Sequence, residues 1–373
     1  MKTKKVLSVC LGLLLFVAFG QATAHTEADP CTTDLIAGQH INVGDVNVWN
    51  DGDNLYVQYV TTGDWELVET HLDVNTSPAG INQTKKGNPI PGQFDYSMEH
   101  DPPVTTYTYT IPLTWAPGTM LAIAAHAVVV DMGDTMIMSA VSGEGGTMVT
   151  RRRAGNTMVF TSLNAAAVAA WEPDGSYPTD PTGDDPWDPS LWDDGLIPSG
   201  YKQVLTDAGA DWIWESYLVQ DPLYGTVITL QNIFDIDGYP VSGDLYITCD
   251  NAYEAFINET SVGSAQVFGN LETCALKQDC VDTTNWQSIE KWGVSGYLEG
   301  GENSLEIDAA NEYFNPDDSS NSSPGTQASN PGGCIFVLEI EYAPQETAWG
   351  AGYDFRGKNW ATYLKYTVQE EPD

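Results

Sequence analysis

Apolar and polar residues alternate with a period of two along much of this chain, and that period is typical of β-strands. The stretch 245–264, LYITCDNAYEAFINETSVGS, predicts a strand, a short polar turn at 250–251 and a second strand, followed by a turn at 258–259. In the second strand Tyr253 falls on one face and Glu254 on the other. The stretch therefore predicts a β-hairpin.

Short strands separated by turn residues are predicted in both halves of the chain. They occupy residues 41–48, 55–60, 65–74, 105–113, 120–130 and 334–341. In the loop 75–94, the two prolines of the segment GNPIPGQF at 87–94 exclude a central strand. Only the alanine-rich segment 164–170 would fit a short helix. The fold class is predicted to be all-β, with two β-sandwich domains.

The first 24 residues have the pattern of a secretory signal peptide. A basic start, MKTKK, precedes an apolar run at 6–20, and small residues at 22–24 precede His25. The run is shorter than the ~20 residues that a membrane span needs. We therefore expect an exported protein, secreted or held at the cell surface, without membrane insertion.

The chain carries 52 acidic residues against 14 Lys and Arg, and its formal net charge is −38. Removal of residues 1–24 would take away three lysines and no acid, which leaves a net charge of −41. Such a field repels nucleic acid and anionic membranes, so neither is an expected partner. It favours solubility, and it suits surroundings in which calcium or salt screens the self-repulsion.

Five cysteines follow the signal peptide, and in an exported protein disulfides are the first expectation. Cys249 lies on one predicted strand and Cys334 opens another, which favours a bridge between them. Cys274 and Cys280 are close enough in sequence to bridge their own loop. The three pairings of these four cysteines stay open, and Cys31 is left over.

Four motifs stand in the first half of the chain: AGQHINVGDVNVWNDGDNLYVQY at 37–59, ETHLDV at 69–74, GNPIPGQF at 87–94 and IAAHAVVV at 123–130. On these motifs the first half resembles a family of exported prokaryotic β-sandwich modules. The resemblance implies a β-sandwich fold.

The second half combines the hairpin 245–264, the pattern W-x-V-S-x-Y-L-x-x-G-x-N-x-L-x-I at 292–307 and the strand 334–341. Over residues 196–343 it resembles the galactose-binding-domain-like jelly roll. That superfold occurs in carbohydrate-binding modules, adhesins and enzyme accessory domains.

An alternating strand at 360–368 follows, and thirty residues cannot bury a core alone. We expect this strand to return to the first sandwich, which would comprise 25–140 and 344–369. The second domain would then be an insertion at 196–343, reached through a Gly-, Asp- and Pro-rich connection at 141–195.

Glu69, His71 and Asp73 alternate along one predicted strand and share a face, and His126 lies in an apolar strand. If the two strands adjoin, the two imidazoles and Glu69 could bind zinc or another transition metal. The alternative is that both histidines are buried, hydrogen-bonded structural groups.

A second metal candidate is the acidic loop 173–198. Its carboxylates are Asp180, Asp184, Asp185, Asp188, Asp193 and Asp194. Oxygen-rich loops suit calcium, so Asp184, Asp185 and Asp188 are candidate ligands of a structural Ca²⁺. The alternative is a solvated acidic linker.

Aromatic and polar residues of the second domain form a candidate ligand site. They are Asp250, Asn251, Glu254, Trp286, Trp292, Asn311, Glu312 and Tyr313. Sugars are bound by aromatic faces together with polar side chains, because sugar rings present C–H patches beside hydroxyls. Tryptophan is also common in sandwich cores, and for any single one of these residues a position in the core is favoured.

We therefore expect an exported, non-enzymatic β-sandwich protein that binds carbohydrate or another surface ligand through its jelly-roll domain. One alternative is a structural or adhesive envelope component whose acidic surface is neutralised by cations. The other is a metal-dependent or glycosidic enzyme, because 52 acids make chance carboxylate pairs certain. The sequence has no G-x-S-x-G motif, phosphate loop or dinucleotide fingerprint.

Overall fold

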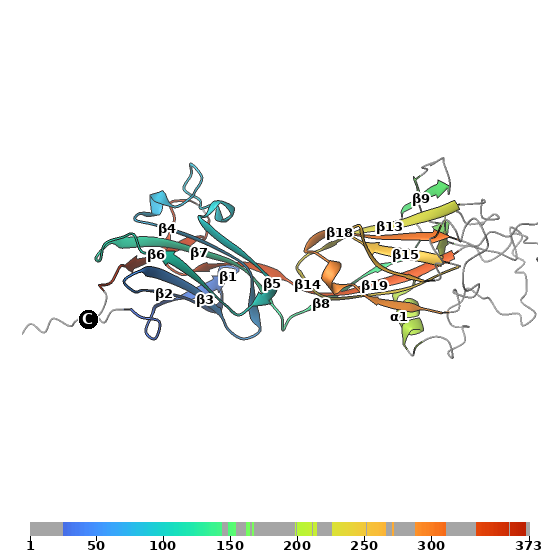
Figure 1. Cartoon of the computed structure of the whole chain (residues 1–373), viewed down its shortest axis with the longest axis horizontal. Helices are drawn as coiled ribbons and strands as arrows, with labels where there is room; N and C mark the ends of the chain where they lie inside the picture. The colour runs from blue at the N-terminus through green and yellow to red at the C-terminus, as the bar shows by residue number, and fades with distance from the viewer. Residues whose placement is uncertain are drawn as a thin grey trace, which may run out of the picture. The chain divides into compact units, whose positions relative to one another are not determined.

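The computed structural model describes residues 25–143, 148–153, 162–164, 166–167, 198, 200–210, 212–214, 226–250, 252–265, 271, 288–310, 333–357 and 359–370. The chain is all-β, as predicted, and divides into two compact units (Figure 1). The first unit comprises Met1–Gly63, Leu67–Ala127 and Ala348–Asp373, and the second comprises Asp64–Glu66 and Val128–Thr347.

The first unit contains one large sheet. Its strands are β1 (Cys31–Ala37), β2 (Ile41–Asn50), β3 (Asn54–Thr61), β4 (Trp65–Asn75), β5 (Tyr96–Val104), β6 (Thr106–Pro112), β7 (Met120–Asp131), β20 (Gln345–Gly350), β21 (Tyr353–Asp354) and β22 (Thr362–Thr367). The strand order is β21-β22-β7-β20-β1-β2-β3-β6, and β4 pairs with β5 and β7. Two 3₁₀ turns, η1 (Pro78–Gly80) and η2 (Pro91–Gln93), lie in the loop between β4 and β5.

The two halves of this sheet pack face to face around a common core. Alternate residues such as Val57 on β3 and Leu121 on β7 are fully buried. The Tyr59 hydroxyl on β3 donates a hydrogen bond to the carbonyl oxygen of His71 on β4 at 2.8 Å, although β3 and β4 are not neighbours in the sheet. That contact joins opposite layers, which makes the unit a β-sandwich.

The C-terminal strand belongs to the same sheet. Leu364 of β22 lies opposite Ile123 of β7 in an antiparallel pair. β20 lies between β1 and β7, so a strand from the end of the chain completes the sheet that the first hundred residues begin.

The second unit contains two further sheets. Its elements are β8 (Met136–Val141), β9 (Met148–Arg153), β10 (Ser162–Asn164), β11 (Ala166–Ala167), α1 (Tyr201–Ala208), β12 (Ile213–Trp214), β13 (Thr226–Ile236), β14 (Tyr239–Asp250), β15 (Ala252–Ile257), β16 (Thr260–Ala265), β17 (Glu290–Gly293), η5 (Ser295–Tyr297), β18 (Gly301–Ala310) and β19 (Gly333–Ala343). One sheet has the order β10-β9-β13-β18-β15-β16, and the other has the order β11-β12-β19-β14-β17 with β8 beside β19.

A single hydrophobic cluster fills the space between these two sheets. Leu245 and Ile247 of β14 meet Tyr253 of β15 and Leu305 of β18 in it. The outer face of β14 and β19 is covered by α1, whose Leu205 is fully buried against Tyr246, Ile335 and Val337. The second unit is therefore also a β-sandwich.

Two local predictions are corrected by the sheet topology. The stretch 245–264 is not one hairpin, because β14 pairs with β17 and β19 while β15 pairs with β16 and β18 in the opposite sheet. The hairpin is β15–β16, with its turn at Asn258 and Glu259 as predicted. Within the alanine-rich segment 164–170, the described residues lie in β10 and β11, not in a helix.

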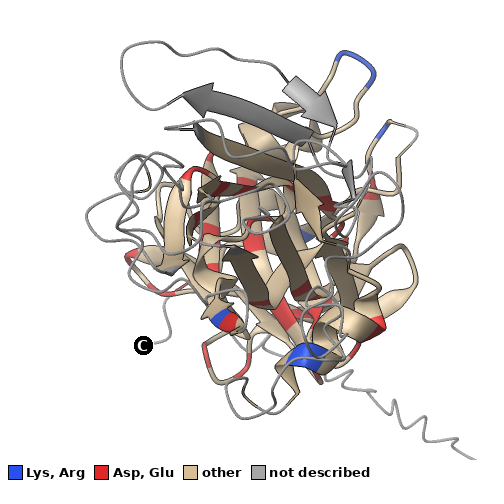
Figure 2. Ribbon diagram, turned by 90° about the vertical axis from the view of Figure 1, so that its right-hand side faces the viewer, with Lys and Arg blue, Asp and Glu red and all other residues tan. Residues whose placement is uncertain are grey.

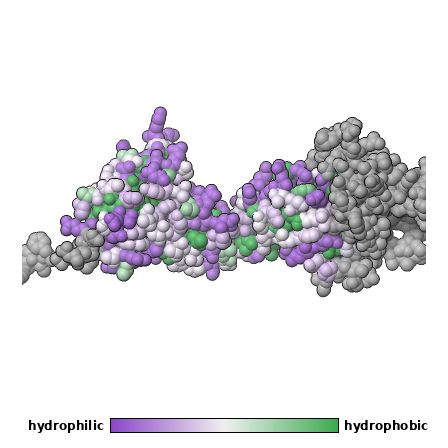
Figure 3. Space-filling view, viewed as in Figure 1, coloured by the Kyte–Doolittle hydropathy of each residue, from purple (hydrophilic) through white to green (hydrophobic). Residues whose placement is uncertain are grey.

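The described surface is polar and acidic. Asp and Glu side chains outnumber Lys and Arg over the described ribbon (Figure 2). On the face drawn in Figure 3, apolar side chains form small separate patches on a mostly hydrophilic surface. Among the described residues, no helix is long and apolar enough to cross a membrane.

Candidate functional site

The strands bring the two candidate histidines of the first unit together. Nδ1 of His71 on β4 lies 3.3 Å from Nδ1 of His126 on the neighbouring strand β7. Glu69 contacts the opposite side of the first ring, with its Oε1 3.0 Å from Nε2 of His71. The three side chains therefore lie in a row and do not converge on one point.

Burial controls the charge of His126. His126 is 6% exposed and packs against the indole of Trp349 at 4.8 Å between ring centroids. Burial, followed by the proximity of His71, lowers the pKa of His126 to about 3. His126 is therefore neutral at physiological pH.

Asp73 lies on the same face of β4 as Glu69 and His71, and it is buried. Its Oδ2 accepts hydrogen bonds from the backbone and side-chain nitrogens of Asn82, at 2.9 and 3.1 Å. Its Oδ1 has no hydrogen-bond partner within the described part of the chain, and burial raises the pKa of the carboxyl group. Over those same residues, no group of three His, Cys, Asp or Glu side chains is placed to hold a metal ion.

Two members of the ligand set predicted in the second unit are engaged in the fold. The indole nitrogen of Trp292 donates to the Tyr253 hydroxyl at 2.9 Å. Its ring packs on Gly263 so closely that a Cβ there would lie 2.2 Å from it. Glu254 accepts a hydrogen bond from the Ser261 hydroxyl at 2.9 Å. Trp292 is thus a packing residue at the edge of the core cluster.

Several predicted site residues lie outside the described residues. They are Asn251, Trp286, Asn311, Glu312 and Tyr313 of the ligand set, Asp184, Asp185 and Asp188 of the calcium set, and Cys274 and Cys280. Of Asp250 only the backbone is described, at the end of β14. The calcium site therefore stays a prediction.

The sheet register places the two predicted cross-strand cysteines directly opposite one another. Cys249 of β14 pairs with Cys334 of β19, and both side chains are fully buried. The bridge itself stays a prediction. Cys31 lies on β1 and is half-buried.

The sequence reasoning missed an aromatic row on the outward face of the first sheet. Register places Trp49 of β2 opposite Tyr56 of β3, and Tyr56 opposite Thr110 of β6. The two rings stack at 5.2 Å between centroids with 13° between their planes. The Tyr56 hydroxyl donates to Oδ2 of Asp51 at 2.8 Å, which fixes the phenol ring.

A row of amides and hydroxyls runs parallel to the aromatic row, one pleat away. The Thr32 hydroxyl donates to Oδ1 of Asn47 at 2.8 Å, Nδ2 of Asn47 donates to Oε1 of Gln58 at 3.3 Å, and Nε2 of Gln58 donates to Oγ1 of Thr108 at 3.2 Å. A primary amide has two N–H donors and a carbonyl oxygen with two lone pairs. Asn47 and Gln58 therefore keep hydrogen-bonding capacity for a ligand.

The aromatic row and the Gln58–Thr108 end of the amide row border a cavity of about 500 Å³, which we call the aromatic–amide groove. Its lining residues are Thr26, Glu27, Trp49, Asn50, Asp51, Tyr56, Gln58, Thr108 and Thr110. Trp49 is 7% exposed, so the half-buried Tyr56 offers the accessible aromatic surface. The groove thus combines an apolar ring with amide, hydroxyl and carboxylate groups.

No protein-family model matches the chain, and comparison with curated proteins gives no match. Among solved structures, the chain is similar to an α-L-rhamnosidase of Streptomyces avermitilis in complex with L-rhamnose (15% identity, 91% of this chain, 27% of that chain, TM-score 0.26). It is also similar to a lectin from Pleurotus ostreatus in complex with GalNAc (14% identity, 88% of this chain, 86% of that chain, TM-score 0.26). The chain spans about a quarter of the rhamnosidase. TM-scores of this size establish no shared fold, so the galactose-binding-like relationship stays a prediction.

Proposed function

We propose that this is an exported, non-enzymatic binding protein that holds a neutral saccharide in the aromatic–amide groove of its first unit. The observation that carries the proposal is the pair of parallel rows on one sheet face: the ring of Tyr56 beside the amide of Gln58. A sugar ring has C–H patches that pack on an aromatic face and hydroxyls that exchange hydrogen bonds with amides.

Three properties of the groove support a ligand of this class. Its volume of about 500 Å³ lies in the range of small-molecule sites. The stacking on Trp49 and the hydrogen bond to Asp51 hold Tyr56 in one orientation, which lowers the entropy lost on binding. Its acidic members, Glu27 and Asp51, can accept hydrogen bonds from hydroxyls but disfavour an anionic ligand.

The site proposed from the sequence in the second unit has less support. Trp292 and Glu254 already have partners within the fold, as described above. We therefore place the saccharide site in the first unit.

The proposal is tested by titrating the mature chain, residues 25–373, with neutral gluco-, xylo-, manno- and galacto-oligosaccharides in a calorimeter. We expect one series to bind, and Tyr56→Ala and Gln58→Ala each to weaken that binding tenfold or more, about 1.4 kcal/mol. Tyr297→Ala is the matched control, because Tyr297 is also an exposed aromatic residue but belongs to the second unit. Thermal unfolding of each variant verifies that the fold is kept.

Two results would contradict the proposal. One is the absence of binding to every neutral series. The other is binding that Tyr56→Ala and Tyr297→Ala change to the same extent, because the ligand would then occupy another site.

A further inference from the structure

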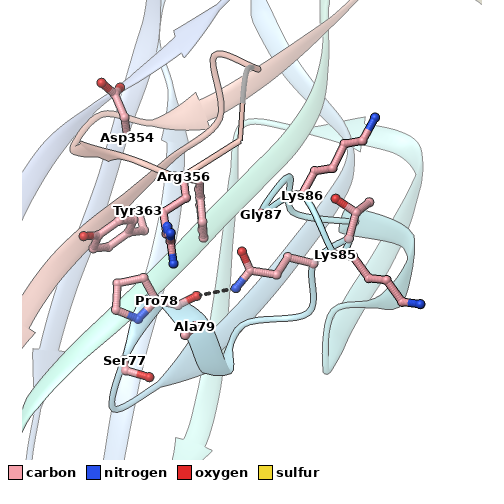
Figure 4. A pocket seen from close by; sticks show the side chains of 12 residues that line it. Ser77, Pro78, Ala79, Lys85, Lys86, Gly87, Asp354, Arg356 and Tyr363 are labelled. Carbon is pink, nitrogen blue, oxygen red and sulfur yellow. Dashed lines mark hydrogen bonds between the residues drawn. The ribbon is translucent and has the colours of Figure 1, made fainter.

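A second cavity of about 670 Å³ opens in the first unit, between the loop that follows β4 and the segment that contains β21 and β22 (Figure 4). Its lining residues are Ser77, Pro78, Ala79, Gln83, Thr84, Lys85, Lys86, Gly87, Asp354, Phe355, Arg356 and Tyr363. None of them lines the aromatic–amide groove. The two cavities are therefore separate sites.

The charge of this second cavity is opposite to that of the chain. Residues 25–127 and 348–373 contain five basic residues: Lys85, Lys86, Arg356, Lys358 and Lys365. Three of the five line the cavity, whereas Asp354 is the one acidic lining residue. Among the described residues, the ion pairs are Glu69–His71 and Asp244–Lys291. Within that part of the chain, none of the three cavity cations forms an ion pair with a carboxylate.

A close contact between two glycines joins the two backbone segments that carry these cations. The backbone N–H of Gly357 donates to the carbonyl oxygen of Gly87 at 3.0 Å. A Cβ on Gly357 would lie 1.6 Å from Oδ1 of Asn88, and Gly87 has a φ of 87°, so both positions favour glycine. Lys86 and Arg356 are the residues that directly precede these glycines, and the contact therefore holds their backbones close together, while the long side chains remain free to reorient toward a ligand.

The rest of the wall is also held in place. The side-chain nitrogen of Gln83 donates to the carbonyl oxygen of Pro78 at 2.8 Å, drawn as the dashed line in Figure 4. Phe355 is 5% exposed and packs edge-on against Tyr363 at 5.2 Å between ring centroids. In Figure 4 the guanidinium of Arg356 points toward the turn at Pro78, whereas the side chains of Lys85 and Lys86, on the same loop as Pro78, extend away from Arg356.

We infer that this cavity binds the oxyanion group of an acidic saccharide, either a uronate carboxylate or a sulfate ester. Arg356 presents the planar fork of N–H donors that matches an oxyanion, and Lys85 and Lys86 add mobile positive charges on flexible stems. Tyr363 supplies an aromatic surface for the sugar ring. The saccharide part of this inference shares its chemistry with the proposed function, whereas the oxyanion contact rests on this cavity alone.

The test compares galacturonate and galactose 6-sulfate with galactose, which differs from them only in lacking the anionic group. Calorimetric titration of the mature chain should show that both anionic sugars bind and that their affinity falls as the salt concentration is raised. The affinity for galactose should not change in Arg356→Gln. Arg356→Gln and the double variant Lys85→Gln/Lys86→Gln should each weaken galacturonate binding about tenfold or more. Excess inorganic sulfate should displace galacturonate.

Lys365→Gln is the matched control, because it removes one positive charge from the same unit outside the cavity, where Nζ of Lys365 lies 3.9 Å from the centroid of the Tyr353 ring. It should leave the affinity for galacturonate within twofold of the wild-type value. Absence of binding by both anionic sugars, or equal effects of Arg356→Gln and Lys365→Gln, would overturn the inference. Tyr56→Ala should leave galacturonate binding unchanged, so failure of the groove proposal and failure of this one are distinguishable.

Discussion

Replacement of His126 by glutamine is expected to change how the stability of the protein depends on pH. The imidazole of His126 is buried against Trp349 and lies beside His71, and its pKa falls from 6.5 to about 3 in the folded state. The unfolded chain therefore binds a proton at His126 below pH 6.5, whereas the folded chain does not. A glutamine amide stays neutral throughout this range, so His126→Gln removes the difference.

The size of the effect follows from proton linkage. Each pH unit between the two pKa values corresponds to about 1.36 kcal/mol, and the free energy of unfolding falls as the pH falls. Between pH 6.5 and pH 4, the contribution of His126 to this loss is ~3 kcal/mol. The stability that depends on a neutral His126 is complete above pH 6.5 and declines as the pH falls toward 3.

The measurement is urea unfolding of the wild type and His126→Gln at pH 7, 5.5 and 4. The variant is expected to be less stable at pH 7, because it loses packing on Trp349, and the gap between the two proteins should narrow by ~3 kcal/mol at pH 4. Glu69, His71 and Asp73 face the same row, and Asp73, whose pKa is raised by burial, opposes the acid loss. All three are present in both proteins, so the comparison isolates His126. A gap that stays constant from pH 7 to pH 4 would refute the reasoning.

Two further outcomes are expected in the second unit. Leu205→Ala should lower the free energy of unfolding by ~2–5 kcal/mol, because Leu205 is the fully buried anchor of α1. Gln203→Ala, on the exposed face of the helix, should change it little. Equal effects of the two variants in urea unfolding would contradict this packing. On the proposal that the protein is exported, Cys249 and Cys334, which are opposite in register, should be bridged, and the double serine variant should lose ~4 kcal/mol. Thiols at both positions that react after unfolding without a reductant would disprove the bridge.

The strands that alternation predicted are present because each has one face in a core. β3, predicted at 55–60, extends over Asn54–Thr61, with Leu55, Val57 and Tyr59 buried and the residues between them half-exposed. β5 was missed because its Pro102 and Pro103 argue against a strand. β5 pairs only with β4, and an edge strand tolerates proline.

The helix α1 was missed for a different reason. Its apolar residues Tyr201, Val204, Leu205 and Ala208 recur at the spacing of an amphipathic helix and pack in one cluster, but the pattern spans only two turns between loop segments and was overlooked. Its local signal is Gly209, which takes the left-handed conformation with a φ of 67° and ends the helix.

The aromatic–amide groove could be predicted only in part. Alternation alone places Asn47 and Trp49 on one face of β2, and Tyr56 and Gln58 on one face of β3. Alternation does not predict that β6 pairs with β3. That pairing brings Thr108 to Gln58, although the two residues are 50 positions apart in the sequence. The second cavity, lined by Lys85, Lys86 and Arg356, could not be predicted for the same reason, because its two walls meet through the distant residues Gly87 and Gly357.

The position of β20 between β1 and β7 has a consequence for biosynthesis. A ribosome delivers the chain from its N-terminus, so β1 and β7 emerge more than two hundred residues before the strand that separates them. Until Gln345–Gly350 arrives, both strands present unpaired backbone edges, which are templates for intermolecular pairing. A chain that terminates early, even one that includes the whole second unit, should therefore aggregate. The first unit can therefore close only after the second unit has been synthesised.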